Sequence, residues 1–284
     1  MPYITTPDGI DLHYHDWGHG EPVVLIHGWP LTSDMWEHQI AFLATNGYRV
    51  IAYDRRGFGK SSKPYGLEGY DVLADDLAAI VNQLDLTGAT LVGMSMGGGE
   101  VVRYLSRHGA SRISKAVLLS SVAPFMLKTD SNPDGTPIAK FDEMRENVKK
   151  DRFAFFQDFA SQFYGRSVIN HSVSQGVLDW TFSMAVQAST KSTYDGIGTF
   201  GETDMREEMK RLTTAFLVIH GTGDKVVPIE AAGRAAAKLL PNSTLIEYDG
   251  APHGLLMTEP DRLNADLLNF LGGNKAPTVT LSQV

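Results

Sequence analysis

The feature of this sequence that most constrains its fold is a repeated alternation between short apolar runs and segments with helical periodicity. The apolar runs hardly alternate between polar and apolar side chains, which is typical of strands buried on both faces of a sheet. These expected strands are residues 22–28, 49–54, 89–93, 113–121, 214–221 and 243–249. The alternation predicts an α/β fold, a mostly parallel, twisted sheet flanked by helices on both faces.

The helical patterns lie between these runs, and the expected helices are residues 33–45, 71–84, 229–240 and 261–271. Ser33 and Asp34 are suitable caps for the first helix, and acidic residues favour the start of the second. One further run, residues 11–17, alternates between polar and apolar residues. It predicts an exposed strand at the edge of the sheet.

The strand pattern stops between Phe125 and Leu212, and the intervening sequence is helical and rich in aromatic residues. We interpret residues 125–212 as a helical lid inserted into an α/β body formed by residues 1–124 and 213–273. Most of the aromatic side chains would pack the lid onto the body, and a minority would cover an apolar ligand pocket. The polar residues 274–284 follow a Gly-Gly pair and predict a flexible tail.

Charge and cysteine content narrow the classes of function. The 284 residues carry a formal net charge of −8, and the Lys and Arg residues are scattered, so nucleic acid or an anionic membrane is not an expected partner. The absence of cysteine excludes disulfides, cysteine nucleophiles and zinc–thiolate sites. No signal peptide and no apolar run of about 20 residues is visible, which predicts a cytoplasmic protein.

A serine between glycines marks the junction of an expected strand and an expected helix. The sequence is Gly93-Met94-Ser95-Met96-Gly97, followed by Gly98 and Gly99. A sharp strand-to-helix turn strains its tip residue and requires small residues two positions before and after it. Such a turn would expose the Ser95 hydroxyl at a helix N-terminus, where backbone N–H groups stabilise negative charge.

A phosphate-binding loop is the alternative function for this glycine-rich stretch. The stretch lacks the Lys-Ser/Thr pair of a nucleotide-binding P-loop, and the dinucleotide-binding Gly-x-Gly-x-x-Gly pattern is also absent. We therefore favour a nucleophilic serine.

A nucleophilic serine needs a base and an orienting carboxylate. Among nine histidines, His253 is the favoured base because it lies in a loop between the last expected strand and the last helix. The others are interpreted as surface, helix-face, lid or turn-shaping residues: His13, His15, His19, His27, His38, His108, His171 and His220. A metal-binding pair at His13 and His15 is the alternative for those two, but no third ligand lies nearby in the sequence.

Two aspartates compete as the orienting acid. Asp224 follows a buried strand in a glycine-rich turn, and Asp249 closes the next strand. We favour Asp224 because Asp249 lies very near His253 in the sequence. For the oxyanion hole, the backbone N–H of Met96 follows the nucleophile, and that of Trp29 begins the loop after residues 22–28. Pro30 has no N–H to offer.

Five stretches carry a family resemblance: LIHGWP, AYDRRGFGKSS, LVGMSMGGGEVVRYLSRHG, VIHGTGDKVVP and APHGL. Together they resemble the cofactor-free bacterial haloperoxidase (perhydrolase)/arylesterase branch of the α/β-hydrolase superfamily. The resemblance extends from about Asp8 to Leu271. The order Ser95, Asp224, His253 is the order of triad residues in that superfamily.

The resemblance implies Ser95 as nucleophile, His253 as base, Asp224 as its partner, and Trp29 and Met96 as oxyanion donors. It also implies an apolar pocket whose substrate-binding residues are Trp29, Phe125, Phe159 and Val226, and a reaction that needs no cofactor or metal. The expected substrates are a small ester or carboxylic acid, with hydrogen peroxide as second substrate for perhydrolysis. A homo-oligomer is one possible state of the protein.

The sequence is compatible with two alternative functions. A lactonase or lactam hydrolase would use the same triad on a cyclic acyl group. A ligand receptor would keep the pocket of a hydrolase without turnover.

Overall fold

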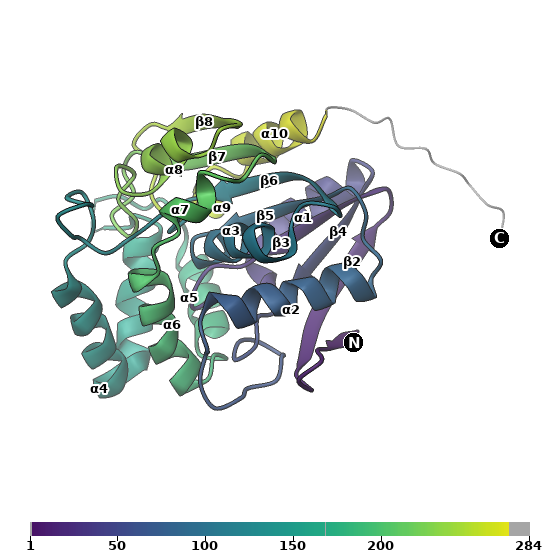
Figure 1. Cartoon of the computed structure of the whole chain (residues 1–284). Helices are drawn as coiled ribbons and strands as arrows, with labels where there is room; N and C mark the ends of the chain where they lie inside the picture. The colour runs from purple at the N-terminus through teal and green to yellow at the C-terminus, as the bar shows by residue number, and fades with distance from the viewer. Residues whose placement is uncertain (1, 168, 273–284) are drawn as a thin grey trace.

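The computed structural model describes residues 2–167 and 169–272. Within them, a single eight-stranded sheet has the strand order β1-β2-β4-β3-β5-β6-β7-β8 (Figure 1). The strands are β1 (Tyr3–Thr5), β2 (Asp11–Gly18), β3 (Glu21–Ile26), β4 (Tyr48–Tyr53), β5 (Ala89–Met94), β6 (Ile113–Leu119), β7 (Ala215–Gly221) and β8 (Ser243–Tyr248). The expected tail, residues 274–284, lies outside the described residues.

The sheet is parallel from β4 through β8, whereas β1–β2 and β2–β4 are antiparallel pairs. The predicted mostly parallel sheet is therefore confirmed. Strand β2 is not the edge of the sheet, because the three-residue strand β1 pairs outside it. A strand of three residues is too short to show the alternation of polar and apolar side chains by which strands are predicted from sequence.

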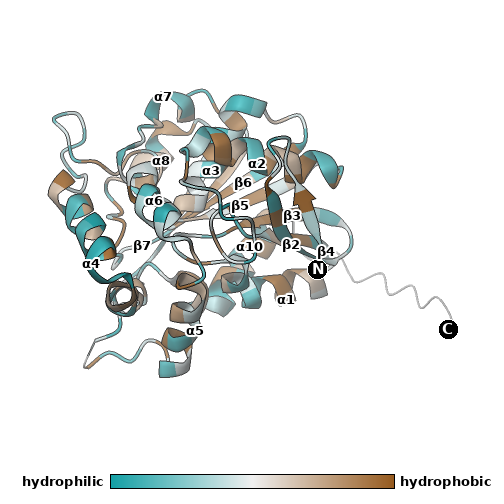
Figure 2. Ribbon diagram, turned by 90° about the horizontal axis from the view of Figure 1, so that it is seen from below, coloured by the Kyte–Doolittle hydropathy of each residue, from teal (hydrophilic) through white to brown (hydrophobic). Residues whose placement is uncertain are grey.

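Helices cover both faces of the sheet, as predicted. The helices of the body are α1 (Glu37–Thr45), α2 (Tyr70–Gln83), α3 (Met96–His108), α8 (Gly233–Leu239), α9 (Leu255–Thr258) and α10 (Pro260–Leu271). Figure 2 shows α2, α3 and α8 on one side of the sheet and α1 and α10 on the other, in agreement with the contacts α2–α3 and α1–α10.

Two helix starts differ from the prediction. Thr32, not Ser33, caps the first segment, which is a 3₁₀ turn (Ser33–Trp36) leading into α1. Ser33 instead uses its backbone N–H and its hydroxyl to hold Asp54 Oδ1, at 2.8 and 2.7 Å. Helix α8 begins only at Gly233, because Ala232 has non-helical dihedrals (φ −118°, ψ −93°).

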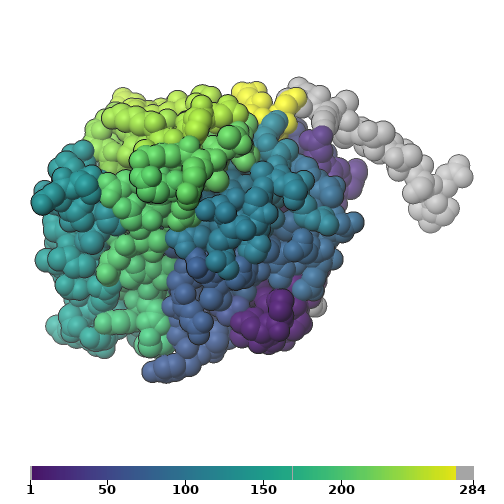
Figure 3. All heavy atoms as spheres, in the orientation of Figure 1, coloured from purple at the N-terminus to yellow at the C-terminus, as the bar shows by residue number. Residues whose placement is uncertain are grey.

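Between β6 and β7 the described chain forms α4 (Ile138–Phe163), α5 (Gln175–Ala185), α6 (Thr190–Glu202) and α7 (Arg206–Met209). Helices α4, α5 and α6 lie at one end of the body, where α4 contacts both α5 and α6, and Figure 3 shows α4 and α6 continuous with the surface of the body. Helix α4 is kinked at Asp151 (φ −161°, ψ 88°). The Asp151 carboxylate accepts hydrogen bonds from the N–H groups of Phe153 and Ala154, and so caps the second half of the helix.

A buried ion pair joins the sheet to helix α3. The side chains of Arg55, which follows β4, and Glu100, on α3, are 1% and 0% exposed and bonded to each other. The other carboxylate oxygen of Glu100 accepts a hydrogen bond from Tyr53 Oη at 2.7 Å, and Arg55 also donates to the carbonyl of His27 at 2.7 Å. The pair therefore connects the ends of β3 and β4 to the first turns of α3.

Replacing Glu100 with Leu should lower the free energy of unfolding by about 3–5 kcal/mol, because the Arg55 guanidinium would stay buried without a carboxylate. The double variant Arg55→Met/Glu100→Leu should recover much of this loss, since it removes both charges. Urea denaturation measures both. As a control, Glu146→Gln breaks the exposed pair with Lys149 and should cost less than about 1 kcal/mol. Equal losses in Glu100→Leu and Glu146→Gln would contradict the prediction.

Candidate active site

Ser95 is the single residue between β5 and α3. Its φ of 53° and ψ of −118° lie outside the regions that non-glycine residues normally adopt. Three backbone hydrogen bonds hold it there: its N–H donates to Leu119, and its carbonyl accepts from Gly98 and Val122, at 2.9 to 3.2 Å. The sharp turn expected from the sequence is therefore present.

The neighbouring glycines are required by close approach of backbone to backbone. A Cβ atom at Gly93 would collide with the backbone of Gly97, and one at Gly97 would collide with the carbonyl groups of Ile26 and His27. The first turn of α3 thus lies directly against the end of β3. That contact outweighs the roughly 1 kcal/mol that each glycine costs a helix relative to alanine.

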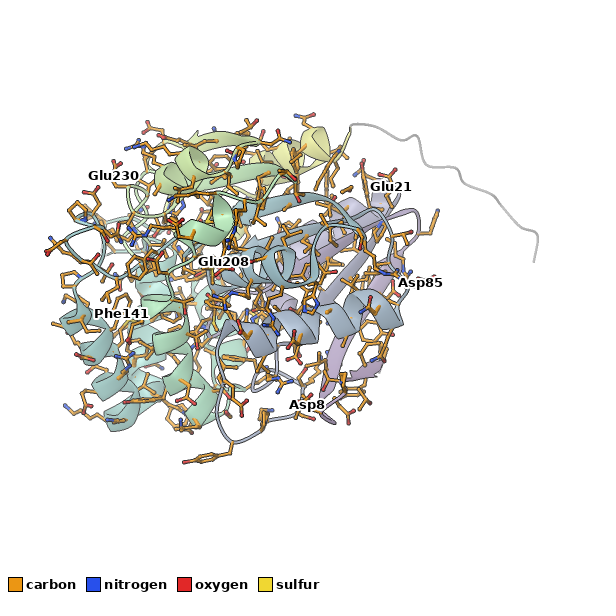
Figure 4. The ribbon with its side chains drawn as sticks, viewed as in Figure 1. Asp8, Glu21, Asp85, Phe141, Glu208 and Glu230 are labelled. Atoms are coloured by element: carbon orange, nitrogen blue, oxygen red, sulfur yellow. The ribbon has the colours of Figure 1, made fainter. Side chains whose placement is uncertain are left out.

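Ser95 lies at the wall of a cavity of about 440 Å³ between the body and helices α4 and α6. Most of the lining side chains are apolar, and most of the polar ones lie on α4. Its lining residues are Trp29, Ser95, Val122, Met126, Thr136, Lys140, Phe141, Glu143, Met144, Asn147, Phe155, Asp158, Phe159, Gln162, Phe200, Lys225, Val226, Val227 and Pro228. Figure 4 marks Phe141 on α4.

Trp29 is the centre of an aromatic cluster in this wall. Its ring lies 5.5 Å from Phe159, 5.4 Å from Phe200 and 6.1 Å from Phe155, measured between ring centroids. The indole N–H donates to the carbonyl of Thr193 on α6 at 3.0 Å. The ring orientation is thus set by elements on both sides of the cavity.

Three of the four predicted pocket residues, Trp29, Phe159 and Val226, line this cavity. Phe125 does not: its buried ring packs under the Arg206 guanidinium, 5.0 Å away, and the next residue, Met126, reaches the cavity instead. Sequence reasoning also missed Phe155 and Phe200. The spacing of Phe155 and Phe159 by four residues on one helix face was the available signal for the first of these.

Asp224 and His253 meet although 29 residues separate them. Asp224 Oδ2 lies 2.7 Å from Nδ1 of His253, and both side chains are buried. Asp224 Oδ1 accepts hydrogen bonds from the N–H groups of Val226 and Val227, both at 2.8 Å. Burial alone would raise the pKa of Asp224, but the charge and hydrogen bond of His253 and the close contact of His220 outweigh it and hold the pKa well below its usual range. The carboxylate is therefore ionised and oriented.

The other ring nitrogen of His253, Nε2, is buried and has no hydrogen-bond partner among the described residues. The Phe163 ring packs edge-on against the imidazole, with centroids 4.8 Å apart. A buried polar atom without a partner is costly, and it is typical of a site that binds or reacts. The rival acid, Asp249, has a different partner: its Oδ1 accepts a hydrogen bond from Thr222 Oγ1.

The two expected oxyanion donors are free within the described chain: neither Trp29 nor Met96 uses its backbone N–H in a hydrogen bond. Met96 follows Ser95 directly. The loop of Trp29 adjoins the same serine, since a Cβ atom on Gly28 would lie 3.3 Å from Ser95 Cβ. The Trp29–Pro30 peptide bond is cis.

One histidine differs clearly from its interpretation as a surface residue. His13 is 1% exposed, its Nδ1 lies 3.4 Å from Asp54 Oδ2, and its ring contacts those of Tyr3 and His15. It is buried because β1, which the sequence did not predict, covers this part of β2. In the described part of the chain, no three His, Asp or Glu side chains gather as a metal site.

His27 has the turn-shaping contacts expected of it. Its Nε2 accepts the N–H of Arg55 at 2.9 Å, and its Nδ1 lies 2.8 Å from the carbonyl of Gly28, to which it donates. Complete burial, and secondly the charge of Arg55, lower the pKa of His27 to about 3. His27 thus stays neutral and holds the loop that leads to Trp29.

Comparison with known proteins agrees with this fold and site. Residues 21–260 match the family described as the alpha/beta hydrolase fold, and the chain belongs to that family. It is 46% identical to a non-heme chloroperoxidase of Streptomyces lividans and 44% identical to a bifunctional esterase/perhydrolase of Acinetobacter calcoaceticus. Each match covers 95% of this chain and 99% of the relative. The resemblance stated from the sequence is confirmed.

Solved structures show the same relationship. The crystal structure of a bromoperoxidase from Bacillus anthracis has a TM-score of 0.90 and 42% sequence identity, over 93% of this chain and 96% of that chain. An esterase from Exiguobacterium antarcticum also has a TM-score of 0.90, at 31% identity over 95% and 98%.

None of the helices in the described residues is both long enough and apolar enough to cross a membrane.

The lowered pKa of His27 predicts a pH dependence of stability. Between pH 6.5 and about pH 3 the unfolded chain binds a proton at His27 that the folded protein does not, so stability falls as the pH falls. The contribution of His27 approaches about 1.4 kcal/mol per pH unit in this window. In urea denaturation at pH 8, 6, 5 and 4, wild type should lose stability faster than His27→Gln, whose amide oxygen can still accept from Arg55. Parallel curves would contradict the prediction.

Proposed function

We propose that this protein is a serine hydrolase that cleaves small carboxylic esters through an acyl-enzyme, and that it forms a peracid when hydrogen peroxide replaces water. One observation carries the proposal: a strained serine lines a cavity with an aromatic wall, beside the backbone N–H groups of Trp29 and Met96, which have no hydrogen-bond partner within the described chain. The names of the relatives, non-heme chloroperoxidase and bifunctional esterase/perhydrolase, support the same two activities.

In the acylation step, Nε2 of His253 takes the proton of the Ser95 hydroxyl while Oγ attacks the ester carbonyl. The negative charge that develops on the carbonyl oxygen is held by the N–H groups of Trp29 and Met96, each contributing about 3 kcal/mol. Asp224 holds the imidazole through Nδ1 and stabilises its protonated form. The imidazolium then returns the proton to the alcohol as the acyl C–O bond breaks.

Deacylation repeats these roles with a second nucleophile. His253 removes a proton from water, which attacks the acyl group and releases the carboxylic acid and Ser95. With hydrogen peroxide as nucleophile, the product is a peracid. The peracid oxidises chloride or bromide to the hypohalous acid and is itself reduced to the carboxylic acid, so that the halide needs no site on the protein.

The proposed partners are therefore a small ester or carboxylic acid and hydrogen peroxide. Residues 125–212 would act as the lid that covers the cavity, because Phe155, Phe159 and Phe200 supply much of its apolar wall. The cytoplasmic location and a homo-oligomeric state stay predictions from the sequence.

Replacing Ser95 with Ala should lower kcat/KM for p-nitrophenyl acetate by about 10⁴-fold or more, because the nucleophile is lost. A fluorophosphonate probe should label Ser95 in wild type, as peptide mass spectrometry would show. Ser120→Ala is a matched control, since Ser120 is also buried and has a positive φ of 44°. Turnover retained in Ser95→Ala would reject the assignment, and absence of labelling in wild type would favour a receptor.

The proposed perhydrolysis leads to a separate prediction about Pro30. A proline after Trp29 restricts the backbone of that residue, and we propose that the Trp29 carbonyl accepts a hydrogen bond from peroxide. Pro30→Ala should then lower the bromination of monochlorodimedone in acetate and peroxide more than it lowers ester hydrolysis. If the two rates fall equally, Pro30 has no specific role with peroxide.

A further inference from the structure

A second histidine contacts the carboxylate that holds His253. His220 is the sixth residue of β7 and is fully buried. Its Nε2 lies 3.3 Å from Asp224 Oδ2, the same oxygen that accepts the bond from His253, and 3.0 Å from the carbonyl oxygen of Val227. Because both neighbours of Nε2 are acceptors, the His220 proton belongs on Nε2. This N–H donates its hydrogen bond to the Val227 carbonyl, and Nε2 also lies in close contact with Asp224 Oδ2.

The ring of His220 is held in place by packing as well as by its contacts with Val227 and Asp224. Gly233, the first residue of α8, lies so close that a Cβ atom there would be 2.8 Å from His220 Cβ and 2.9 Å from Nδ1. Nδ1 has no hydrogen-bond partner among the described residues. The ring is therefore enclosed on its Nδ1 side, and among its two nitrogens only Nε2 makes a hydrogen bond that fixes the ring orientation.

The contacts of His220 span the turn that carries the acid. Asp224 Oδ2 accepts a hydrogen bond from His253 and contacts His220 Nε2, and Oδ1 accepts from the N–H groups of Val226 and Val227. Since His220 also donates to the Val227 carbonyl, it connects both ends of this turn. Val226 and Val227 line the cavity, so the same turn sets the carboxylate and part of the substrate wall.

We propose that His220 is a positioning residue: through Nε2 it holds Asp224 Oδ2 toward His253 and withdraws electron density from that oxygen. This inference rests on the proposed function. A carboxylate that gives up density to a second N–H group stabilises positive charge on its first donor less, and removal of the second group would reverse this effect.

The charged and titratable groups around His220 are few. Asp224 follows its own strand, His253 precedes α9, and Glu247 is its partner in the register of β8. Glu247 is paired with Arg234 of α8, at 2.7 Å for both hydrogen bonds. Strand β6, on the other side, presents Leu119 and the uncharged Ser120 at this level.

The test compares His220→Leu, which removes the donor, with His220→Gln, whose amide N–H can reach the position of Nε2. His220→Leu should lower kcat for p-nitrophenyl acetate by about 10- to 100-fold, in the range seen when a group that orients a functional side chain is lost. KM should change little, and the acid limb of the kcat/KM profile should move up by about one pH unit. His220→Gln should restore most of kcat and return the limb toward wild type.

His13→Leu is the matched control, because it removes another buried histidine that contacts a different aspartate. It should leave the acid limb in place. The inference would be overturned if folded His220→Leu kept the kcat of wild type. It would also be overturned if the acid limb of its kcat/KM profile stayed in place or moved to lower pH.

A measurement on wild type covers the case in which His220→Leu does not fold. Ring ¹⁵N NMR, assigned by loss of one imidazole in His220→Gln, should show His220 protonated at Nε2 and not at Nδ1. The opposite tautomer would overturn the inference. Activity that survives in Ser95→Ala would refute the proposed function itself, whereas activity lost in Ser95→Ala but unchanged in His220→Leu would refute only the role of His220.

Discussion

The close approach of helix α3 to the end of strand β3 is the contact on which the site depends. Gly97 lies against the carbonyl groups of Ile26 and His27 with no room for a side chain. This contact forces the chain to turn within one residue, so that Ser95 takes a strained conformation and its side chain faces the cavity. It also places Met96 and the loop of Trp29, which are remote in the sequence, beside Ser95. The buried Arg55–Glu100 pair joins α3 to the chain that follows β4, and Arg55 also donates to the carbonyl of His27, just beyond β3.

The carboxylate of Asp224 is the centre of a second group of contacts, in the turn that carries Val226 and Val227 into the cavity wall. Its hydrogen bonds come from groups that the fold has fixed, namely two peptide N–H groups and the imidazole of His253, and the imidazole of His220 lies in close contact with it. In the proposed reaction, a preorganised carboxylate of this kind would stabilise charge on His253 without rearrangement. Its turn also presents Val226 to the ligand, so the orientation of the acid and the shape of the pocket depend on each other.

The aromatic wall gives the site its low polarity. Trp29 supplies a backbone N–H at the serine and a side chain in the wall, and its indole is anchored to Thr193 on α6. The body and the helices inserted between β6 and β7 are therefore joined at the residue that would meet substrate. Because apolar walls exclude water, the electrostatic interactions inside are stronger than they would be in solvent.

The sequence by itself determined the parallel sheet and the strand-to-helix turn at Ser95, because buried strands and tight turns restrict residue type over a few neighbouring positions. It also indicated Asp224 and His253 through their places at strand ends. Only the tertiary structure decided that Asp224 rather than Asp249 meets His253, that Phe125 turns away from the cavity, and that a three-residue strand buries His13. These outcomes depend on contacts between segments far apart in the chain, which leave no local periodicity to read.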